Sequence, residues 1–151
     1  MRYETEKLLA ARAKALGDSA AADALPDLLG LCQSASPLAR RLAASAIGKL
    51  AGIVDAGAAV AALKPMLGDV HPQVRQYAAK ALGTYGLAAE SALPALRDML
   101  RNPVEADYVK RSVTAAGLAI KAAMEIAARQ RAETCRLHAR RQAPDLALSR
   151  G

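Results

Sequence analysis

The sequence predicts an all-α fold, an α-solenoid of about three helical hairpins with an extra N-terminal helix and a long C-terminal helix. The main observation is an internal repeat, because residues 36–48 (SPLARRLAASAIG) align without a gap on residues 71–83 (HPQVRQYAAKALG), 35 positions later. Residues 109–116 follow more loosely at the same offset. A period of this length is typical of stacked helical hairpins. Composition agrees, since the chain has no Phe or Trp and is rich in Ala, the best helix former.

The expected helices follow in order along the chain. Residues 6–17 resemble the second helix of a hairpin standing alone, because residues 15–17 (ALG) echo residues 46–48 (AIG). The first helices of the three hairpins repeat an apolar pattern of i, i+3, i+6 and i+7, which lies on one helical face. These core positions are Leu25, Leu28, Leu31 and Cys32, then Val60, Leu63, Met66 and Leu67, then Leu93, Leu96, Met99 and Leu100.

The second helices have their own apolar face, and turn residues mark their ends. Pro37 and Pro72 suit the first position of a helix, where the missing N–H costs little. Gly48, Gly83 and Gly86 are expected where second helices end. In the second hairpin, the core positions of the second helix are Val74, Tyr77, Ala78, Ala81, Leu82 and Tyr85.

Other signals concern the first helices and the loops. Asp23 and Ser91 are expected as N-caps of helices that open with a proline. Pro65 is expected to kink its helix or to mark a late start. The offset changes by two residues in the third hairpin, which predicts an insertion near residues 102–107, in a loop.

Residues 118–141 keep a helical pattern, so we expect a long terminal helix that covers the last hairpin. Its apolar stripe consists of Ile120, Met124, Ala127 or Ala128, and Leu137. Because the stripe outruns the hairpin, it predicts a homodimer through the C-terminal helix, with a folded-back or frayed monomeric helix as the alternative. Residues 1–141 are expected to form one domain and residues 142–151 a disordered basic tail.

Residues 72–83 (PQVRQYAAKALG) resemble the second helix of a HEAT-like repeat, closest to the short repeats of phycobilisome lyase subunits. Residues 37–48 resemble it almost as well, whereas the third unit departs because Gly117 sits one place early. The resemblance covers roughly residues 20–122 and implies a right-handed superhelix. It also implies a non-catalytic protein-binding scaffold, because the motif encodes packing rather than chemistry. A chaperone for a tetrapyrrole is a further expectation by analogy alone.

Opposite the core face, the second helices are expected to form the concave wall that solenoids use for binding. The row contains basic and amide side chains but no acid, so it is suited to an acidic peptide or to phosphates. The expected partner-binding residues are Leu38, Arg41, Ser45, Lys49, Gln73, Gln76, Lys80, Tyr108 and Arg111. A nucleic-acid-binding module that uses this face and the Arg-rich C-terminal helix is the alternative function. The simpler explanation of the row is a solvated helix face.

A second matched set, Arg40, Arg75 and Lys110, is expected to pair with acids in nearby turns or helices. Asp69 is the expected partner of Arg75. This set therefore predicts structural ion pairs rather than a ligand site.

No pattern indicates an enzyme or a cofactor. His71 and His138 are the only histidines, and neither is followed by the Glu that HEAT-like iron hydroxylases repeat. The chain has no Gly-rich phosphate loop, no Ser-His-Asp set and none of the Trp that lines the groove of HEAT-like DNA glycosylases. Cys135 and His138 have the spacing of half a zinc site, but no second pair completes it within one chain. Cys32 is expected to be a core thiol.

The net charge of +7 is uneven. Residues 129–151 carry six Arg against Glu133 and Asp145, whereas residues 1–128 carry 15 basic and 12 acidic side chains. A basic C-terminus can contact nucleic acid, anionic lipid or an acidic protein, or it can be a solvated helix end. The polar opening residues and the lack of an uncharged apolar run of 18 residues predict a cytoplasmic protein that does not enter a membrane.

Overall fold

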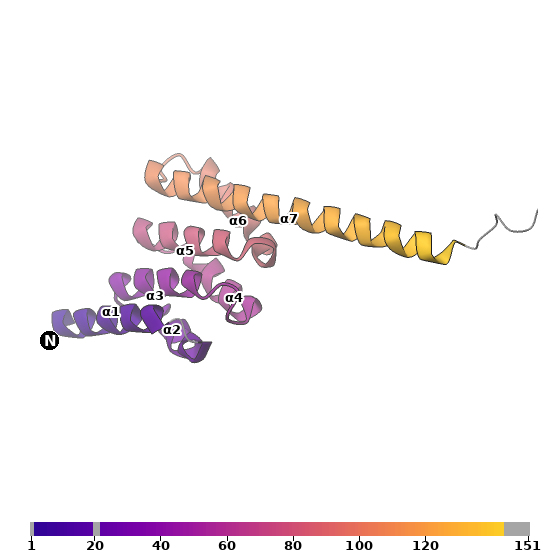
Figure 1. Ribbon diagram of the computed structural model, residues 1–151. Helices are drawn as coiled ribbons and strands as arrows, with labels where there is room; N and C mark the ends of the chain where they lie inside the picture. Colours follow the sequence, from indigo (N-terminus) through magenta and orange to yellow (C-terminus); the bar gives the residue numbers. More distant parts are fainter. Residues whose placement is uncertain (1, 20–21, 144–151) are drawn as a thin grey trace, which may run out of the picture.

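The computed structural model describes residues 2–19 and 22–143, and in this part of the chain it contains helices but no strand. Figure 1 shows α1, α3, α5 and the first half of α7 stacked as one layer, with each helix contacting the next. The helices α2, α4 and α6 each pack against the helix that follows them. The elements are α1 (Arg2–Ser19), η1 (Ala22–Ala24), α2 (Leu25–Leu31), α3 (Pro37–Lys49), α4 (Ala56–Met66), α5 (Pro72–Thr84), η2 (Gly86–Ala92), α6 (Leu93–Arg101) and α7 (Asp107–Gln142). The prediction of an all-α solenoid is confirmed.

The core lies between the two layers of helices and uses the positions that the repeat predicts. All eight predicted core residues of the first two hairpins' first helices are buried. In the third hairpin Leu96 is buried, Leu93 and Met99 are half-buried, and Leu100 is 39% exposed. The difference follows from position, because α6 is the last helix of its layer in the described chain and no further hairpin covers it.

Small residues let the helices of the α1, α3, α5 and α7 layer approach closely. A Cβ atom added to Gly48 would lie 3.1 Å from the Cα of Ala81, and one added to Gly83 would lie 3.1 Å from the Cα of Ala116. Ala81 and Ala116 are themselves 35 residues apart, so the same contact recurs in successive units. Gly48 and Gly83 therefore lie near the ends of α3 and α5, where they are needed for helix packing. The third predicted glycine, Gly86, follows the end of α5 with a positive φ of 52° and suits the turn.

A tyrosine links the end of one unit to the next. The buried hydroxyl of Tyr85 donates a hydrogen bond of 2.7 Å to the carbonyl of Ile47, near the end of α3. Burial raises the pKa of Tyr85 to about 12. The same carbonyl also accepts the backbone N–H of Leu50 at 3.1 Å, so the bond from Tyr85 is a second one that ties the end of α3 to the following hairpin.

Two of the three predicted ion pairs exist, those of Arg40 and Arg75, but the partner assigned to Arg75 is wrong. Asp69 binds Arg40 instead, with Nε–Oδ2 and Nη2–Oδ1 distances of 2.7 and 3.0 Å. Arg75 binds Glu105 through two bonds of 2.8 Å, and it reaches Asp69 only at the backbone carbonyl. Each arginine thus pairs with a carboxylate in the loop of the following unit. The loop that precedes its own helix contributes only backbone carbonyl acceptors. Lys110 has no ion pair in the described chain.

The predicted N-caps Asp23 and Ser91 are wrong. Each lies in a 3₁₀ helix that leads directly into α2 or α6, so the cap position falls on Ala24 or Ala92, without a side-chain bond. A 3₁₀ turn satisfies the first N–H groups with backbone carbonyls, so no capping side chain is needed. Side chains do cap α3, at Ser36, and α4, at Asp55.

Two further expectations are tested by the helix bounds. Pro65 lies in the last turn of α4, which starts at Ala56, so Pro65 does not mark a late start. The predicted long C-terminal helix is confirmed over residues 118–141, and it continues the second helix of the third hairpin, because α7 runs without a break for 36 residues. Gly117 does not end it, since one glycine costs only about 1 kcal/mol in a helix otherwise rich in good helix formers. The predicted insertion near residues 102–107 does form the loop before α7.

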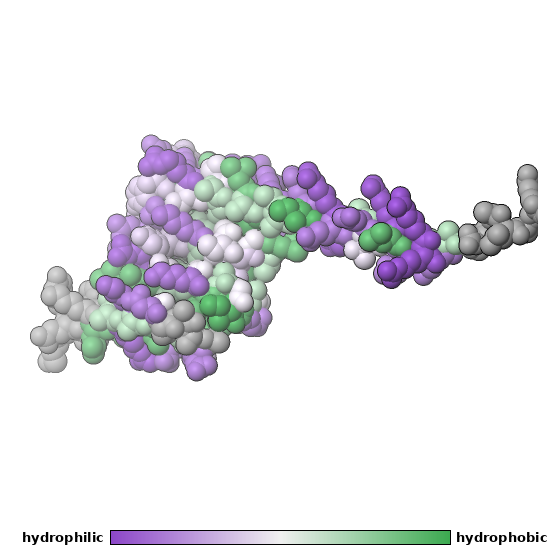
Figure 2. All heavy atoms as spheres, viewed as in Figure 1, coloured by the Kyte–Doolittle hydropathy of each residue, from purple (hydrophilic) through white to green (hydrophobic). Residues whose placement is uncertain are grey.

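Burial along α7 ends well before the helix does. Ile120 is its last buried residue, Ala127 its last half-buried one, and every residue from 128 to 143 is exposed. The second half of α7 therefore projects beyond the stacked helices (Figures 1 and 2). Residues 144–151 of the predicted tail lie outside the described residues. In the part of the chain that the structure describes, no helix is long and apolar enough to cross a membrane.

Candidate binding wall

The predicted partner-binding residues lie on one face of α3, α5 and α7, and we call this face the wall. Because the three helices lie side by side at a 35-residue offset, equivalent residues form rows across them. The first row is Leu38, Gln73 and Tyr108, and the second is Arg41, Gln76 and Arg111. All predicted members are exposed or half-buried, so the wall is accessible.

A hollow of about 430 Å³ lies at the start of the three helices. It brings together four of the predicted residues, Leu38, Arg41, Gln73 and Tyr108. The remaining lining residues are Pro37, His71, Pro72 and Val74. The hollow therefore combines apolar surface with one guanidinium and one amide, whereas Ser45, Lys49, Gln76, Lys80 and Arg111 lie outside it.

Two cations share one aromatic ring beside this hollow. The guanidinium carbon of Arg41 lies 5.4 Å from the ring centroid of Tyr77, and Nζ of Lys80 lies 5.1 Å from it. Both distances are within the range of a cation–π interaction. The repeat assigned Tyr77 to the core, but it is half-buried and belongs partly to the wall. The sequence could have indicated this, because Tyr77 is close to wall positions 73, 76 and 80 on the same helix.

Arg41 has unused hydrogen-bonding capacity. Its Nη1 donates to Oε1 of Gln73 at 3.3 Å, in an exposed bond. Its Nε is buried and has no hydrogen-bond partner. A buried donor without an acceptor costs about 1–3 kcal/mol, so the position of Arg41 is held at some cost to stability.

Other predicted wall residues are engaged within the protein. Nε2 of Gln76 donates to Oγ of Ser112 at 3.2 Å, which ties α5 to α7. Lys49 lies 3.7 Å from the carboxylate of Asp18, at the end of α1. The nine predicted wall residues include no acid, but this pair brings a carboxylate of α1 to one end of the wall. Both side chains of this pair are 60% exposed, so the pair contributes little.

Three wall cations remain without a carboxylate partner in the described chain: Arg41, Lys80 and Arg111. They come from three successive helices of the layer, α3, α5 and α7. Arg41 and Lys80 lie close to each other, because both contact the ring of Tyr77. The wall thus presents positive charge next to apolar and amide groups, which suits a ligand with carboxylate or phosphate oxygens.

The cysteines and histidines do not gather into a metal site in the described chain, where no three potential His, Cys, Asp or Glu ligands lie together. Cys135 and His138 are exposed on α7. Cys32 is buried, as predicted, and burial raises the pKa of its thiol to about 11.

Residues 50–119 match the family model of HEAT repeats. The matched segment spans α4, α5, α6 and the first part of α7, which are the elements that form the second and third hairpins. No curated protein matches the chain. Together, the match and the stacked hairpins show HEAT-like repeats over residues 50–119, and HEAT repeats generally serve as protein-interaction scaffolds.

Proposed function

We propose that this protein is a non-catalytic scaffold whose wall binds an acidic segment of a partner protein. The observation that supports the proposal is a hollow lined by Arg41, with Lys80 nearby at the Tyr77 ring, because neither cation has a carboxylate partner in the described chain. Carboxylates of a partner would supply the missing negative charge.

The apolar part of the hollow favours a peptide over a bare anion. Leu38, Pro37 and Tyr108 provide contact surface for the side chains between the carboxylates. Apolar contact adds roughly 25 cal/mol for each Å² removed from water, whereas charges at the rim mainly set specificity and association rate. A segment that mixes acidic and apolar residues therefore fits the wall best.

The test is the affinity for a short fluorescent peptide in which Glu and Leu alternate, measured by fluorescence anisotropy. The variant Arg41→Ala/Lys80→Ala should bind at least about 10-fold more weakly, because each site loses a charge–carboxylate contact. The matched control, Lys64→Ala/Arg97→Ala, removes the same charge from α4 and α6, outside the wall, and should change affinity less than about 3-fold.

Binding to a DNA duplex, and the dependence of that binding on salt, distinguishes the alternative function, a nucleic-acid-binding module, from the proposed one. If the wall bound nucleic acid, the wall variant would lose affinity for a DNA duplex, and that affinity would fall steeply with salt. Equal effects of the wall variant and its control on peptide binding would contradict the proposal, since only net charge would then matter.

A further inference from the structure

The second half of α7 contains a charged segment that the wall does not use. We call residues 129–142 the arm, and all of them are exposed and project away from the stacked helices (Figure 2). At 1.5 Å per residue the arm is about 21 Å long. An isolated helix of this length is only marginally stable in water, so a partner that binds it would stabilise it.

Charge distinguishes the arm from the rest of the protein. It carries five Arg against a single acid, Glu133, and its arginines are residues 129, 131, 136, 140 and 141. Every ion pair of the described chain joins residues between 12 and 105, and none involves the arm. The body thus pairs five of its cations with carboxylates, whereas no arginine of the arm has an ion pair in the described chain.

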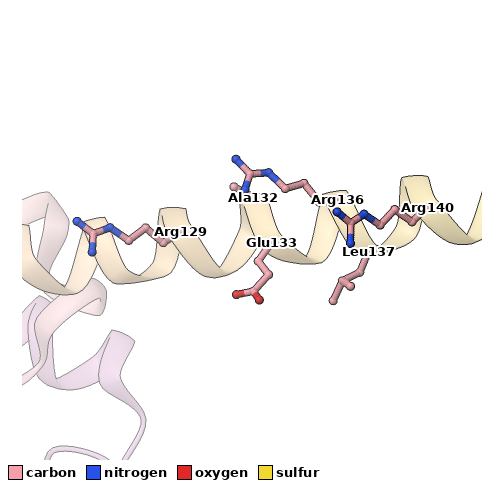
Figure 3. Close-up of a pocket in the computed structure, with 6 residues that line it drawn as sticks. All are labelled: Arg129, Ala132, Glu133, Arg136, Leu137 and Arg140. Carbon is pink, nitrogen blue, oxygen red and sulfur yellow. The ribbon is translucent and has the colours of Figure 1, made fainter.

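Three of these arginines form a row. Figure 3 shows Arg129, Arg136 and Arg140 along one face of the arm, with the side chains of Glu133 and Leu137 pointing toward its lower edge. Glu133, four residues after Arg129, is the one acid on this face. The spacing of i, i+7 and i+11 keeps the three on one helical face. Arg129 and Arg140 are about 16.5 Å apart along the axis at 1.5 Å per residue.

We propose that the arm binds double-stranded DNA, lying in the major groove and contacting backbone phosphates through Arg129, Arg136 and Arg140. An α-helix with its side chains is about 10–12 Å wide, and the major groove of B-form DNA is about 12 Å wide. Guanidinium groups bind phosphates through two parallel hydrogen bonds. Phosphate contacts carry no sequence information, so the binding is independent of sequence.

Other nucleic acids fit the arm less well. Proteins that hold single strands stack the bases on aromatic side chains, and residues 129–142 contain no Phe, Tyr or Trp. The major groove of double-stranded RNA is too narrow and deep for side chains to read. A DNA duplex is therefore the form that the shape and chemistry of the arm favour.

A second copy of the chain and a membrane fit the arm less well too. Two arms would bring net charges of +4 together, and Leu137 is the only large apolar side chain among residues 129–142. A stable interface usually buries about 1,200 Å² or more, and a helix at a bilayer surface needs a continuous apolar face. A polyanion instead removes the repulsion among the arginines.

The test compares duplex binding by the full-length protein and two triple variants, using fluorescence anisotropy. The probe is a fluorescent duplex of about two helical turns. The arm variant is Arg129→Ala/Arg136→Ala/Arg140→Ala, and the control, Lys14→Ala/Lys64→Ala/Arg97→Ala, removes the same charge from α1, α4 and α6. Circular dichroism verifies that each variant is folded.

Loss of three phosphate contacts should reduce the slope of log affinity against log salt by about 2.7. Between about 50 and 200 mM salt, the unmodified protein should therefore lose about 40-fold more affinity than the arm variant loses. The control variant should keep the original slope. The variant Glu133→Gln removes the one acid of the arm and should bind the duplex about 3-fold or more tightly.

Equal slopes of log affinity against log salt for the arm and control variants would overturn the proposal. Tighter binding to a single strand, to polyglutamate or to anionic vesicles than to the duplex would overturn it as well. So would a dimer, seen by light scattering, that depends on the arm. The inference is independent of the proposed function of the wall. The wall variant Arg41→Ala/Lys80→Ala should keep the salt slope of duplex binding, and a failure of peptide binding would leave the DNA result unaffected.

Discussion

At the scale of single residues, the strongest polar contacts join one repeat unit to the next. Glu105 accepts two hydrogen bonds of 2.8 Å from Arg75, and its side chain is only 3% exposed. Hydrogen bonds from Arg75 lower the pKa of Glu105, although burial opposes the shift. Burial also opposes the shift of Asp69, but hydrogen bonds from Arg40 and from the backbone of His71 still lower its pKa. Both carboxylates therefore stabilise the fold in their charged form.

We predict that Glu105→Gln lowers the free energy of unfolding by about 1–3 kcal/mol at neutral pH, because it leaves the partly buried Arg75 without its charged partner. The exposed pair of Arg101 and Asp98 provides the control, since Asp98→Asn should change stability by less than about 0.5 kcal/mol. Urea unfolding followed by circular dichroism measures both. Equal losses in the two variants would contradict the role assigned to the Arg75–Glu105 pair.

The same pair predicts a dependence on pH. The pKa of Glu105 is lower in the folded protein than its ordinary value of about 4.3, so its contribution is fully present above that value. The contribution is lost as the pH falls through the lower, folded pKa. The stability difference between the unmodified protein and Glu105→Gln should therefore stay nearly constant from neutral pH down to that ordinary value and shrink as the pH falls further. A difference that grows on acidification would contradict the sign of the shift.

The two cysteines should differ in reactivity. A pKa of about 11 leaves roughly one in a thousand Cys32 thiols ionised near pH 8, and only the thiolate reacts with disulfide reagents. Cys135 is exposed. We predict that one thiol per native chain reacts quickly with such a reagent, that Cys135→Ser abolishes this phase, and that urea exposes the second thiol. A fast phase that persists in Cys135→Ser would show that Cys32 is accessible.

At the scale of helices, close contact between small residues sets the spacing of the layer. Gly48 and Gly83 face the backbone of Ala81 and Ala116 in the next helix. The equivalent of Gly83 in the last unit, 35 residues on, is Leu118, which is 64% exposed. A leucine at this position keeps another helix from approaching as closely, so α7 forms a natural end of the stack.

Two glycines on neighbouring helices should respond in opposite directions to substitution. Gly83→Leu should lower the free energy of unfolding by about 1–3 kcal/mol or more, because its side chain meets the backbone of Ala116. Gly117→Ala should raise it by about 0.5–1 kcal/mol, since no atom lies within 4 Å of the added Cβ and alanine favours the helix. Thermal and urea unfolding measure both effects. Destabilisation by Gly117→Ala would show that another group packs there.

The sequence repeat predicted the hairpins well, because the core positions recur at fixed offsets and packing requires them to do so. It could not place the ion pairs in the correct unit, since Arg40 and Arg75 each have acids on both sides along the chain. It also missed the 3₁₀ turns at Asp23 and Ser91, where backbone bonds replace a capping side chain. In both cases, the choice of an arginine's partner and the way a helix begins, the local alternatives have nearly equal energy. The packing of the whole structure decides between them.

For the binding wall, the sequence brought Leu38, Arg41, Gln73 and Tyr108 together correctly, because the offset of 35 residues alone determines their rows. It missed Tyr77, since a residue at the edge of a helical face has the periodicity of the core while remaining accessible. Pairing of Asp18 with Lys49 was missed as well, because α1 lies outside the repeat.

At the scale of the whole molecule, the chain divides into a packed body and an exposed arm. The ion pairs and the buried side chains of the described chain all lie before residue 121. Figure 1 shows the arm leaving the body as the continuation of a helix that is packed only in its first half. The stability of the body and the charge of the arm are therefore separable properties.

We predict that a chain ending at Ala128 keeps the stability of the full chain. The deletion removes only exposed arm side chains from the described structure, so the free energy of unfolding should change by less than about 0.5 kcal/mol. Urea unfolding at equal protein concentration measures this, and the shortened chain should retain peptide binding while losing duplex binding. A loss of more than about 1 kcal/mol would mean that the arm packs against the body or against a second chain, since exposed residues without contacts contribute little to stability.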